Sequence, residues 1–271
     1  MRRPALNPLK GKVAVVTGGT GGIGRGVALQ LAERGASVVI NGRSADKAKV
    51  VLEEIRRLDG RGSFAGGDVR SLADMRTVME AAAREFGGVD IVVPNAGGND
   101  EEARSPQVRG SFPGIDLERV THFVGQAIAA KLLVVQAAVP FMRERGGGSV
   151  VFVTSEGGRS PTPGQTAIAT FSGGLIAGSK VLAKDLARDN IRVNCVCVTV
   201  VRDTPSWDAV FGAESTVSEM HRKQYEKILA RSPLGVASPS DIGRVVAFLA
   251  SDDAAYLTGT VVSPTGGLTI H

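Results

Sequence analysis

The residues that most constrain the fold are Thr17 to Gly24, which read Thr-Gly-Gly-Thr-Gly-Gly-Ile-Gly. They follow Val13 to Val16, an uncharged β-branched run that is typical of a buried parallel strand. From Arg25 onward, apolar residues recur at helical spacing until Gly35, which is typical of a helix C-cap. The segment therefore predicts a strand, a tight turn and a helix within the first 35 residues.

Such a turn brings backbone N–H groups and the positive end of a helix dipole to one point, where a diphosphate can bind. We expect Gly18 to form the turn, Gly22 to let phosphates approach the backbone, and Gly24 to let the helix pack on the strand. Thr20 and Ile23 complete this predicted binding segment. A plain turn is the alternative, because glycine accounts for 35 of the 271 residues.

A second predicted strand, Ser37 to Ile40, completes a βαβ unit, and the residues after it are where such units meet the adenosine ribose. An acid there would accept hydrogen bonds from a free 2′-hydroxyl, but this chain has Asn41-Gly42-Arg43-Ser44. Arg43 and Ser44 suit a 2′-phosphate, which favours NADP(H) over NAD(H). The alternative is that Arg43 is a solvated loop residue.

Strands and helices are predicted to alternate through the rest of the chain, which indicates a Rossmann-like, doubly wound parallel sheet in the α/β class. No low-complexity linker or repeat divides the sequence, so we expect a single domain over residues 1–271. The further strands are expected at 63–69, 89–94, 149–154, 191–198 and 259–262, and the further helices at 44–58, 71–86, 116–145, 166–188 and 240–250.

The carboxyl ends of parallel strands form the ligand-binding rim of such a sheet. We expect the segments that directly follow the strands to lie on that rim, and these are Thr17–Gly24, Arg43, Asp68-Val69, Asn95-Ala96-Gly97, Ser155 and Thr199–Thr204. Two long polar stretches, at about 98–114 and 203–231, extend from the rim and are interpreted as a pocket wall and a lid. An ordinary surface helix is the alternative for the second stretch.

Composition argues against several classes of protein. The formal net charge is +5, but cations alternate with acids and only 4% of residues are aromatic, so we expect no nucleic-acid partner. We expect no membrane span, because no segment reaches the roughly 18 apolar residues that a span requires. Cys195 and Cys197 are interpreted as reduced core residues of a cytoplasmic protein, without a metal site.

The ordered motifs resemble those of the short-chain dehydrogenase/reductase family over essentially the whole chain. The matching segments are Thr17 to Gly24, Asp68-Val69, Asn95-Ala96-Gly97, Ser155, Ile191 to Asn194, and Val245 to Gly259. The resemblance implies a Rossmann fold, a nicotinamide cofactor, a small-molecule substrate and a homodimer or homotetramer built partly from helices 116–145 and 166–188. It also implies that Asp68 and Val69 contact the adenine and that Asn95, Ala96 and Gly97 line the cofactor.

The chain departs from the family where the chemistry is performed. The family uses a Tyr-x-x-x-Lys pair after the serine, but those two positions hold Ile168 and Ser172. The position of an asparagine that helps to hold a relay water falls on Ala127, next to Gln126. Among the usual catalytic groups, only Ser155 is retained.

Several other polar groups are candidates for replacing the lost pair. They are Glu156, Arg159, Thr166, Thr170, Ser172, His122 and His221. Isoleucine cannot transfer a proton, and general acid–base help is worth roughly 10² to 10⁴ in rate. The sequence therefore predicts an oxidoreductase with a non-standard proton path, acting on a carbonyl or an already cationic iminium. The alternatives are a nonredox enzyme of cyclase or dehydratase type, and a catalytically silent partner subunit.

Overall fold

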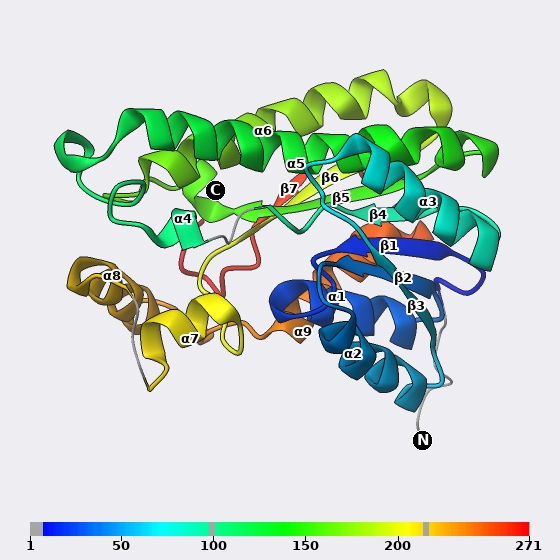
Figure 1. Cartoon of the computed structure of the whole chain (residues 1–271), viewed down its shortest axis with the longest axis horizontal. Coiled ribbons are helices and arrows are strands. Elements are labelled where there is room, and N and C mark those ends of the chain that lie inside the picture. The colour runs from blue at the N-terminus through cyan, green and yellow to red at the C-terminus, as the bar shows by residue number, and fades with distance from the viewer. Residues whose placement is uncertain (1–7, 98–100, 214–216, 271) are drawn as a thin grey trace.

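The computed structural model describes residues 8–97, 101–213 and 217–270, and its centre is one parallel sheet of seven strands (Figure 1). The strands are β1 Val13–Thr17, β2 Ser37–Gly42, β3 Arg61–Gly66, β4 Ile91–Val93, β5 Gly148–Ser155, β6 Ile191–Val198 and β7 Val261–Val262. Their order is β3-β2-β1-β4-β5-β6-β7. The chain therefore winds outward in both directions from the boundary between β1 and β4, where such sheets bind ligands.

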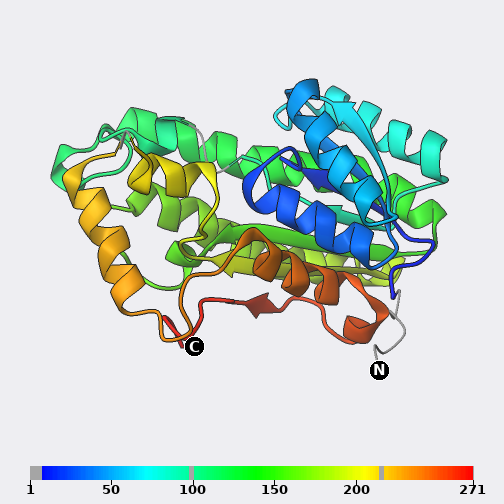
Figure 2. The same cartoon turned by 90° about the horizontal axis from the view of Figure 1, so that it is seen from below.

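Helices cover both faces of the sheet (Figures 1 and 2). One face is covered by α1 Gly22–Glu33, α2 Ala45–Arg57 and α9 Pro239–Ala250, and the other by α3 Leu72–Phe86, α5 Leu117–Glu144 and α6 Thr166–Asp185. Shorter helices at one end of the molecule are α4 Glu101–Arg104, α7 Pro205–Phe211 and α8 Glu219–Ala230. The 3₁₀ turns are η1 Phe112–Gly114, η2 Glu156–Gly158, η3 Ala187–Asp189 and η4 Asp252–Ala254. The predicted single-domain, doubly wound fold is confirmed.

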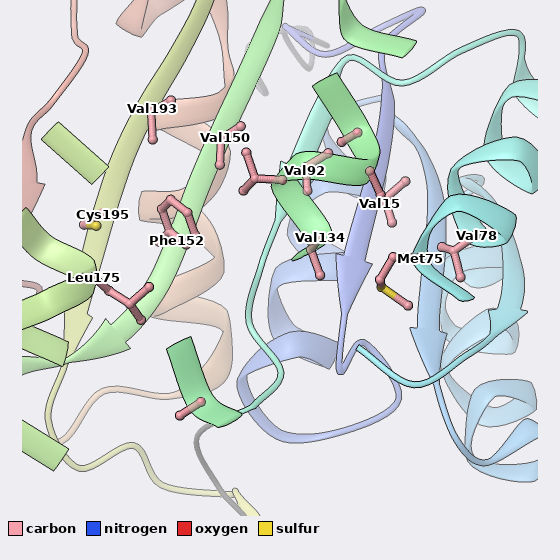
Figure 3. Packing of buried hydrophobic residues seen from close by; sticks show 14 of the residues in the cluster. Val15, Met75, Val78, Val92, Val134, Val150, Phe152, Leu175, Val193 and Cys195 are labelled. Atoms are coloured by element: carbon pink, nitrogen blue, oxygen red, sulfur yellow. The ribbon is translucent and has the colours of Figure 1, made fainter. Parts of the chain in front are cut away.

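Two clusters of buried apolar side chains form the core, one on each face of the sheet. Figure 3 shows the first cluster, in which Val92 and Phe152 from the strands face Val134, Met75 and Leu175 from the helices. Because both faces are covered, every residue of β1 and β4 is buried. This two-sided burial explains why these strands have continuous apolar runs.

The boundary of the third strand was predicted wrongly. β3 ends at Gly66, so Asp68 and Val69 lie outside the strand that was expected at 63–69. The backbone N–H of Asp68 donates to the Asp74 carboxylate at 2.9 Å, and Ser71 caps α3. These bonds draw the segment into the turn before α3, where local side chain–backbone pairing replaces the sheet ladder.

Two helices have the length and composition of a membrane span, contrary to the expectation that no segment does. They are α5 and α6, which lie side by side over the sheet in Figure 1. Each contributes buried side chains to the first core cluster, among them Val134 and Ala138 from α5 and Leu175 and Ala183 from α6. Packing against the sheet accounts for their apolar character.

Candidate active site

The residues at the carboxyl ends of the central strands surround a cavity of about 1160 Å³. Its lining includes eight of the predicted binding residues, namely Gly18, Thr20, Gly22, Ile23, Arg43, Asn95, Ala96 and Gly97, together with Ser155. A smaller cavity of about 210 Å³ adjoins it and is also lined by Asp68 and Val69. Gly24 and Ser44 line neither cavity.

The glycine turn is packed so closely that side chains cannot be added at two of its positions. A Cβ atom on Gly24 would lie 2.1 Å from the backbone oxygen of Gly18, and one on Gly18 would lie 2.9 Å from the Asn95 amide nitrogen. Gly18 and Gly22 also have positive φ angles of 67° and 51°. Because α1 begins at Gly22, its unpaired N–H groups face the cavity. This cradle fits a diphosphate.

The loop after β4 is fixed to the end of β1. The Thr17 hydroxyl oxygen accepts hydrogen bonds from the backbone N–H groups of Asn95 and Ala96, at 3.1 and 3.2 Å. The Asn95 amide donates to the backbone oxygen of Thr17 at 3.1 Å. Gly97 has a φ of 102°, and a Cβ there would lie 2.9 Å from that of Ala130. These contacts hold the predicted Asn-Ala-Gly segment as one wall of the cavity.

The end of β2 presents cations and no acid to the cavities. Asn41 is buried, and its amide donates to the backbone oxygens of Ala65 and Gly67, so it joins β2 to β3. Arg43 is exposed at the rim of both cavities, and Lys47 lines the larger one. Ser44 uses its hydroxyl to cap α2 by accepting from the Lys47 N–H at 3.3 Å. A helix N-terminus and two cations therefore face the same rim.

Asp68 lines the smaller cavity and is ionised. Its carboxylate accepts from the Arg70 guanidinium at 2.7 Å, and this pairing lowers the pKa of Asp68 to about 2. Gln126 and Ala127, which stand at and beside the place of the family's relay asparagine, line the same cavity. Ser155 lines the larger cavity.

Ser155, Ile168 and Ser172 come together as their spacing predicts, but only two of them face the cavity. The Ser155 hydroxyl oxygen accepts from the Gly157 N–H at 3.1 Å, and the Ser155 N–H donates to the Ser172 hydroxyl at 3.4 Å. Ile168 lines the cavity beside Gly157, whereas Ser172 is fully buried and does not line it. An apolar side chain thus stands where the family places a proton donor.

Other candidates for replacing the pair are only partly brought to the site. Glu156 is 3% exposed and lines the cavity, but its carboxylate accepts from the hydroxyls of Ser263 and Thr269. Thr170 and His122 are exposed and line neither cavity. Arg159 and Thr166 also lie outside both linings, and Arg159 donates to Ser263 at 2.8 Å.

His221, on α8, does line the larger cavity and is 3% exposed. Its ring packs edge-on against Tyr225, with centroids 4.9 Å apart. Burial, together with the positive charges of Arg109 and Arg104, lowers the pKa of His221 to about 4. The imidazole is therefore neutral at neutral pH.

Lys131 is a candidate that sequence reasoning missed. It lies on α5, is 2% exposed and lines the larger cavity. Its ammonium donates to the backbone oxygens of Pro94, Asn95 and Val153 at 3.0, 2.9 and 2.9 Å. Burial lowers the pKa of Lys131 to about 7, while three carbonyl acceptors match the three N–H donors of the charged form. A single lysine inside an apolar helical run was the available signal.

Comparisons with known proteins agree with this geometry. The family profile described as Enoyl-(Acyl carrier protein) reductase matches residues 18–269. The chain is 33% identical to Dehydrogenase/reductase SDR family member 4 of Bos taurus, covering 98% of this chain and 90% of that protein. It is 30% identical to the 3-oxoacyl-(acyl-carrier-protein) reductase FabG of Thermotoga maritima, covering 97% and 99%.

Among solved structures, a 7 alpha-hydroxysteroid dehydrogenase complexed with NADH and 7-oxo glycochenodeoxycholic acid superimposes with a TM-score of 0.84. The two chains are 26% identical, and the match covers 98% of each. The chain belongs to the short-chain dehydrogenase/reductase family of oxidoreductases. This membership implies a nicotinamide dinucleotide cofactor, and the glycine cradle fits one.

Proposed function

We propose that this chain is an NADP(H)-dependent oxidoreductase that reduces a small carbonyl or iminium compound without the family's Tyr–Lys pair. The observation that carries the proposal is the combination in one cavity of a close-packed glycine cradle, Ser155, and Ile168 in place of the proton donor. The first of these supports cofactor binding, and the last supports an altered proton path.

The preference for NADP(H) is supported by the rim at the end of β2. Arg43 has no hydrogen-bond partner for its guanidinium among the described residues, and Lys47 stands beside it at the start of α2. A guanidinium binds a phosphate through two parallel N–H donors, and a helix N-terminus adds favourable charge. An acidic side chain at position 41 or 42 would repel a 2′-phosphate. These positions hold Asn41 and Gly42, which carry no charge.

The nicotinamide ring supplies the hydride when the cofactor is bound. The Ser155 oxygen accepts from Gly157, which leaves the O–H group to donate a hydrogen bond that orients the substrate. Ile168 excludes water beside it but cannot supply a proton. Lys131 joins the loop after β4 to strand β5, and we assign it as a positioning residue. An iminium, already cationic, needs no proton from the protein.

The proposal is tested by following the loss of NADPH absorbance with matched iminium and carbonyl substrates. We expect reduction of the iminium to exceed that of the carbonyl by roughly 10² to 10⁴, the usual value of general acid help. Ile168→Tyr should raise the rate with the carbonyl and leave the rate with the iminium unchanged. NADPH binding without turnover of either class would contradict the redox proposal.

We further propose a cytoplasmic homodimer or homotetramer in which segment 203–231 acts as a lid and segment 98–114 as a pocket wall. Cavity-lining residues from both segments support the lid and wall; residues 98–100 of the wall and 214–216 of the lid lie outside the described residues. Leu132 on α5 and Val181 on α6 are 39% and 57% exposed, which supports an interface on these helices. Light scattering coupled to gel filtration tests the oligomeric state.

A further inference from the structure

The charged residues that line the larger cavity are mostly cations. Among the described residues they are Arg43, Lys47, Arg104, Arg109, Lys131, Lys223, Lys227 and Arg231, against the acids Glu156 and Glu219. Lys223 is paired with Glu219 at 2.7 Å, and Lys131 is held by three carbonyls. Arg43 and Lys47 stand at the proposed cofactor end. The remaining charge excess requires another explanation.

Arg109 and His221 meet around one aromatic ring. The Arg109 guanidinium lies 5.8 Å from the centroid of the Tyr225 ring, and the His221 ring lies 4.9 Å from it. Tyr225 is supported in turn by Phe211 at 6.2 Å, which packs on Trp207 at 4.6 Å. The aromatic chain fixes the side of α8 that faces the cavity.

Two polar atoms in this group lack hydrogen-bond partners. The Nε atom of Arg109 and the Nε2 atom of His221 are buried, and neither has a partner among the described residues. A buried polar group without a partner costs about 1–3 kcal/mol, so such groups are rare in native structures. Because His221 is 97% buried and lines the cavity, its unpaired nitrogen indicates a missing ligand at this point.

Among the described residues, the surroundings of this pair are positive and contain no unpaired acid that could compete for it. Arg104 also lines the cavity and forms no ion pair within the described part of the chain. Burial and the charges of Arg109 and Arg104 lower the pKa of His221, which stays a neutral imidazole and can donate one N–H. The lining of the same cavity also includes Ser155 and the apolar side chains of Ile168 and Phe171.

We propose that Arg104, Arg109 and His221 bind a carboxylate at the distal end of the substrate, whose apolar body lies against Ile168 and Phe171. The inference rests on the proposed function, because it places the reacting carbon of that substrate at Ser155. Planar, forked guanidinium groups match a carboxylate, and a phosphate shares this chemistry. The substrate class is thus an oxo or iminium carboxylic acid.

The test uses Trp207, the only tryptophan of the chain, as a fluorescent reporter next to the aromatic chain. The probes are 4-oxo-4-phenylbutanoate, its methyl ester and phenyl phosphate, followed by aliphatic oxo acids with their esters. Binding is measured with the NADPH-loaded protein and with the protein alone. Arg109→Gln removes the charge, and Arg222→Gln, on α8 beside His221, is the control, because Arg222 pairs with Glu226 at 3.6 Å and lines neither cavity.

We expect an acid of the panel to bind roughly 10 to 100 times more tightly than its ester, as charged hydrogen bonds allow. Arg109→Gln should abolish this preference and leave NADPH affinity unchanged, whereas Arg222→Gln should retain it. Equal affinities of acids and esters, or a preference that survives Arg109→Gln, would overturn the inference. Tighter binding of phenyl phosphate than of every acid would overturn the assignment to a carboxylate.

The same samples distinguish a failure of the proposed anion site from a failure of the proposed redox function. Calorimetry with NADPH reports cofactor binding without any acid present. If NADPH fails to bind while acids are still preferred over esters, the proposed redox function fails and the anion site stands. If NADPH binds and is consumed but no acid is preferred, the anion site alone is refuted.

Discussion

Lys131→Met is the most informative single substitution for the floor of the cavity. It keeps an unbranched side chain of similar length and removes the ammonium that joins the oxygens of Pro94, Asn95 and Val153. The Pro94 oxygen would keep its bond from the Val153 N–H at 3.4 Å, but the other two acceptors left unpaired would cost roughly 2–6 kcal/mol in total. Removing a buried charge offsets part of that. We expect the free energy of unfolding to fall by about 2–4 kcal/mol at pH 7.

The pH dependence of this difference follows from the lowered pKa of Lys131. In the folded chain the pKa is about 7, against an ordinary value of 10.5, so between these values the unfolded chain binds the extra proton. The stability of the wild type should therefore rise with pH relative to Lys131→Met, by up to about 1.4 kcal/mol per pH unit. Between pH 7 and 9 this amounts to roughly 2–3 kcal/mol.

Urea unfolding of both proteins at pH 6, 7, 8 and 9 measures this difference. Lys180→Met is the control, because Lys180 is exposed on α6 and the same chemical change there should add no such slope. A difference that stays constant from pH 7 to 9 would refute the reasoning, since it would mean that Lys131 remains protonated throughout despite its burial.

Three further predictions concern the glycine turn before α1, the cavity rim at Arg43, and His221 on α8. Gly24→Ala should lower the free energy of unfolding by about 1–3 kcal/mol, because its Cβ would overlap a backbone oxygen. Gly21→Ala is the control, because a Cβ atom there would have no other atom within 4 Å, and it should leave this free energy nearly unchanged in urea unfolding. Arg43→Gln should weaken NADPH binding about 10- to 100-fold and leave NADH binding unchanged in calorimetry; equal losses would contradict a 2′-phosphate contact. Because the pKa of His221 is lowered from 6.5 to about 4, the folded chain should lose stability as pH falls from 6.5 to 4, by up to about 3 kcal/mol. Trp207 emission should report this loss, and His221→Gln should remove it; an identical acid response in that variant would refute the assignment.

Local sequence patterns were sufficient to predict the fold. Continuous apolar runs such as Val13 to Val16 mark strands buried on both faces, and the glycine turn marks the first crossover. The number of residues from Ser155 and back from Ile191 also predicts that Ile168 and Ser172 stand at the Tyr and Lys positions, and this stays a prediction. These features depend on spacing along the chain, which a sequence displays directly.

What could not be predicted depends on contacts between distant elements. Lys131 matters because the ends of β4 and β5 place three carbonyl oxygens around its ammonium, and no local pattern records that meeting. Arg109 and His221 lie 112 positions apart and meet only through Tyr225. The end of β3 was misplaced because Asp74 and Ser71 draw Asp68 into a turn, a side-chain effect that outweighs a weak strand pattern.

The central claim is that an intact cofactor cleft operates here without a tyrosine–lysine pair. The most direct measurement supplies NADPH deuterated at the transferable position together with an iminium substrate, and follows the label by mass spectrometry. The account predicts deuterium on the reduced carbon of the product, with Ile168 unchanged and without added acid catalyst. Tight NADPH binding with no label in any product of the iminium or carbonyl panel would contradict it.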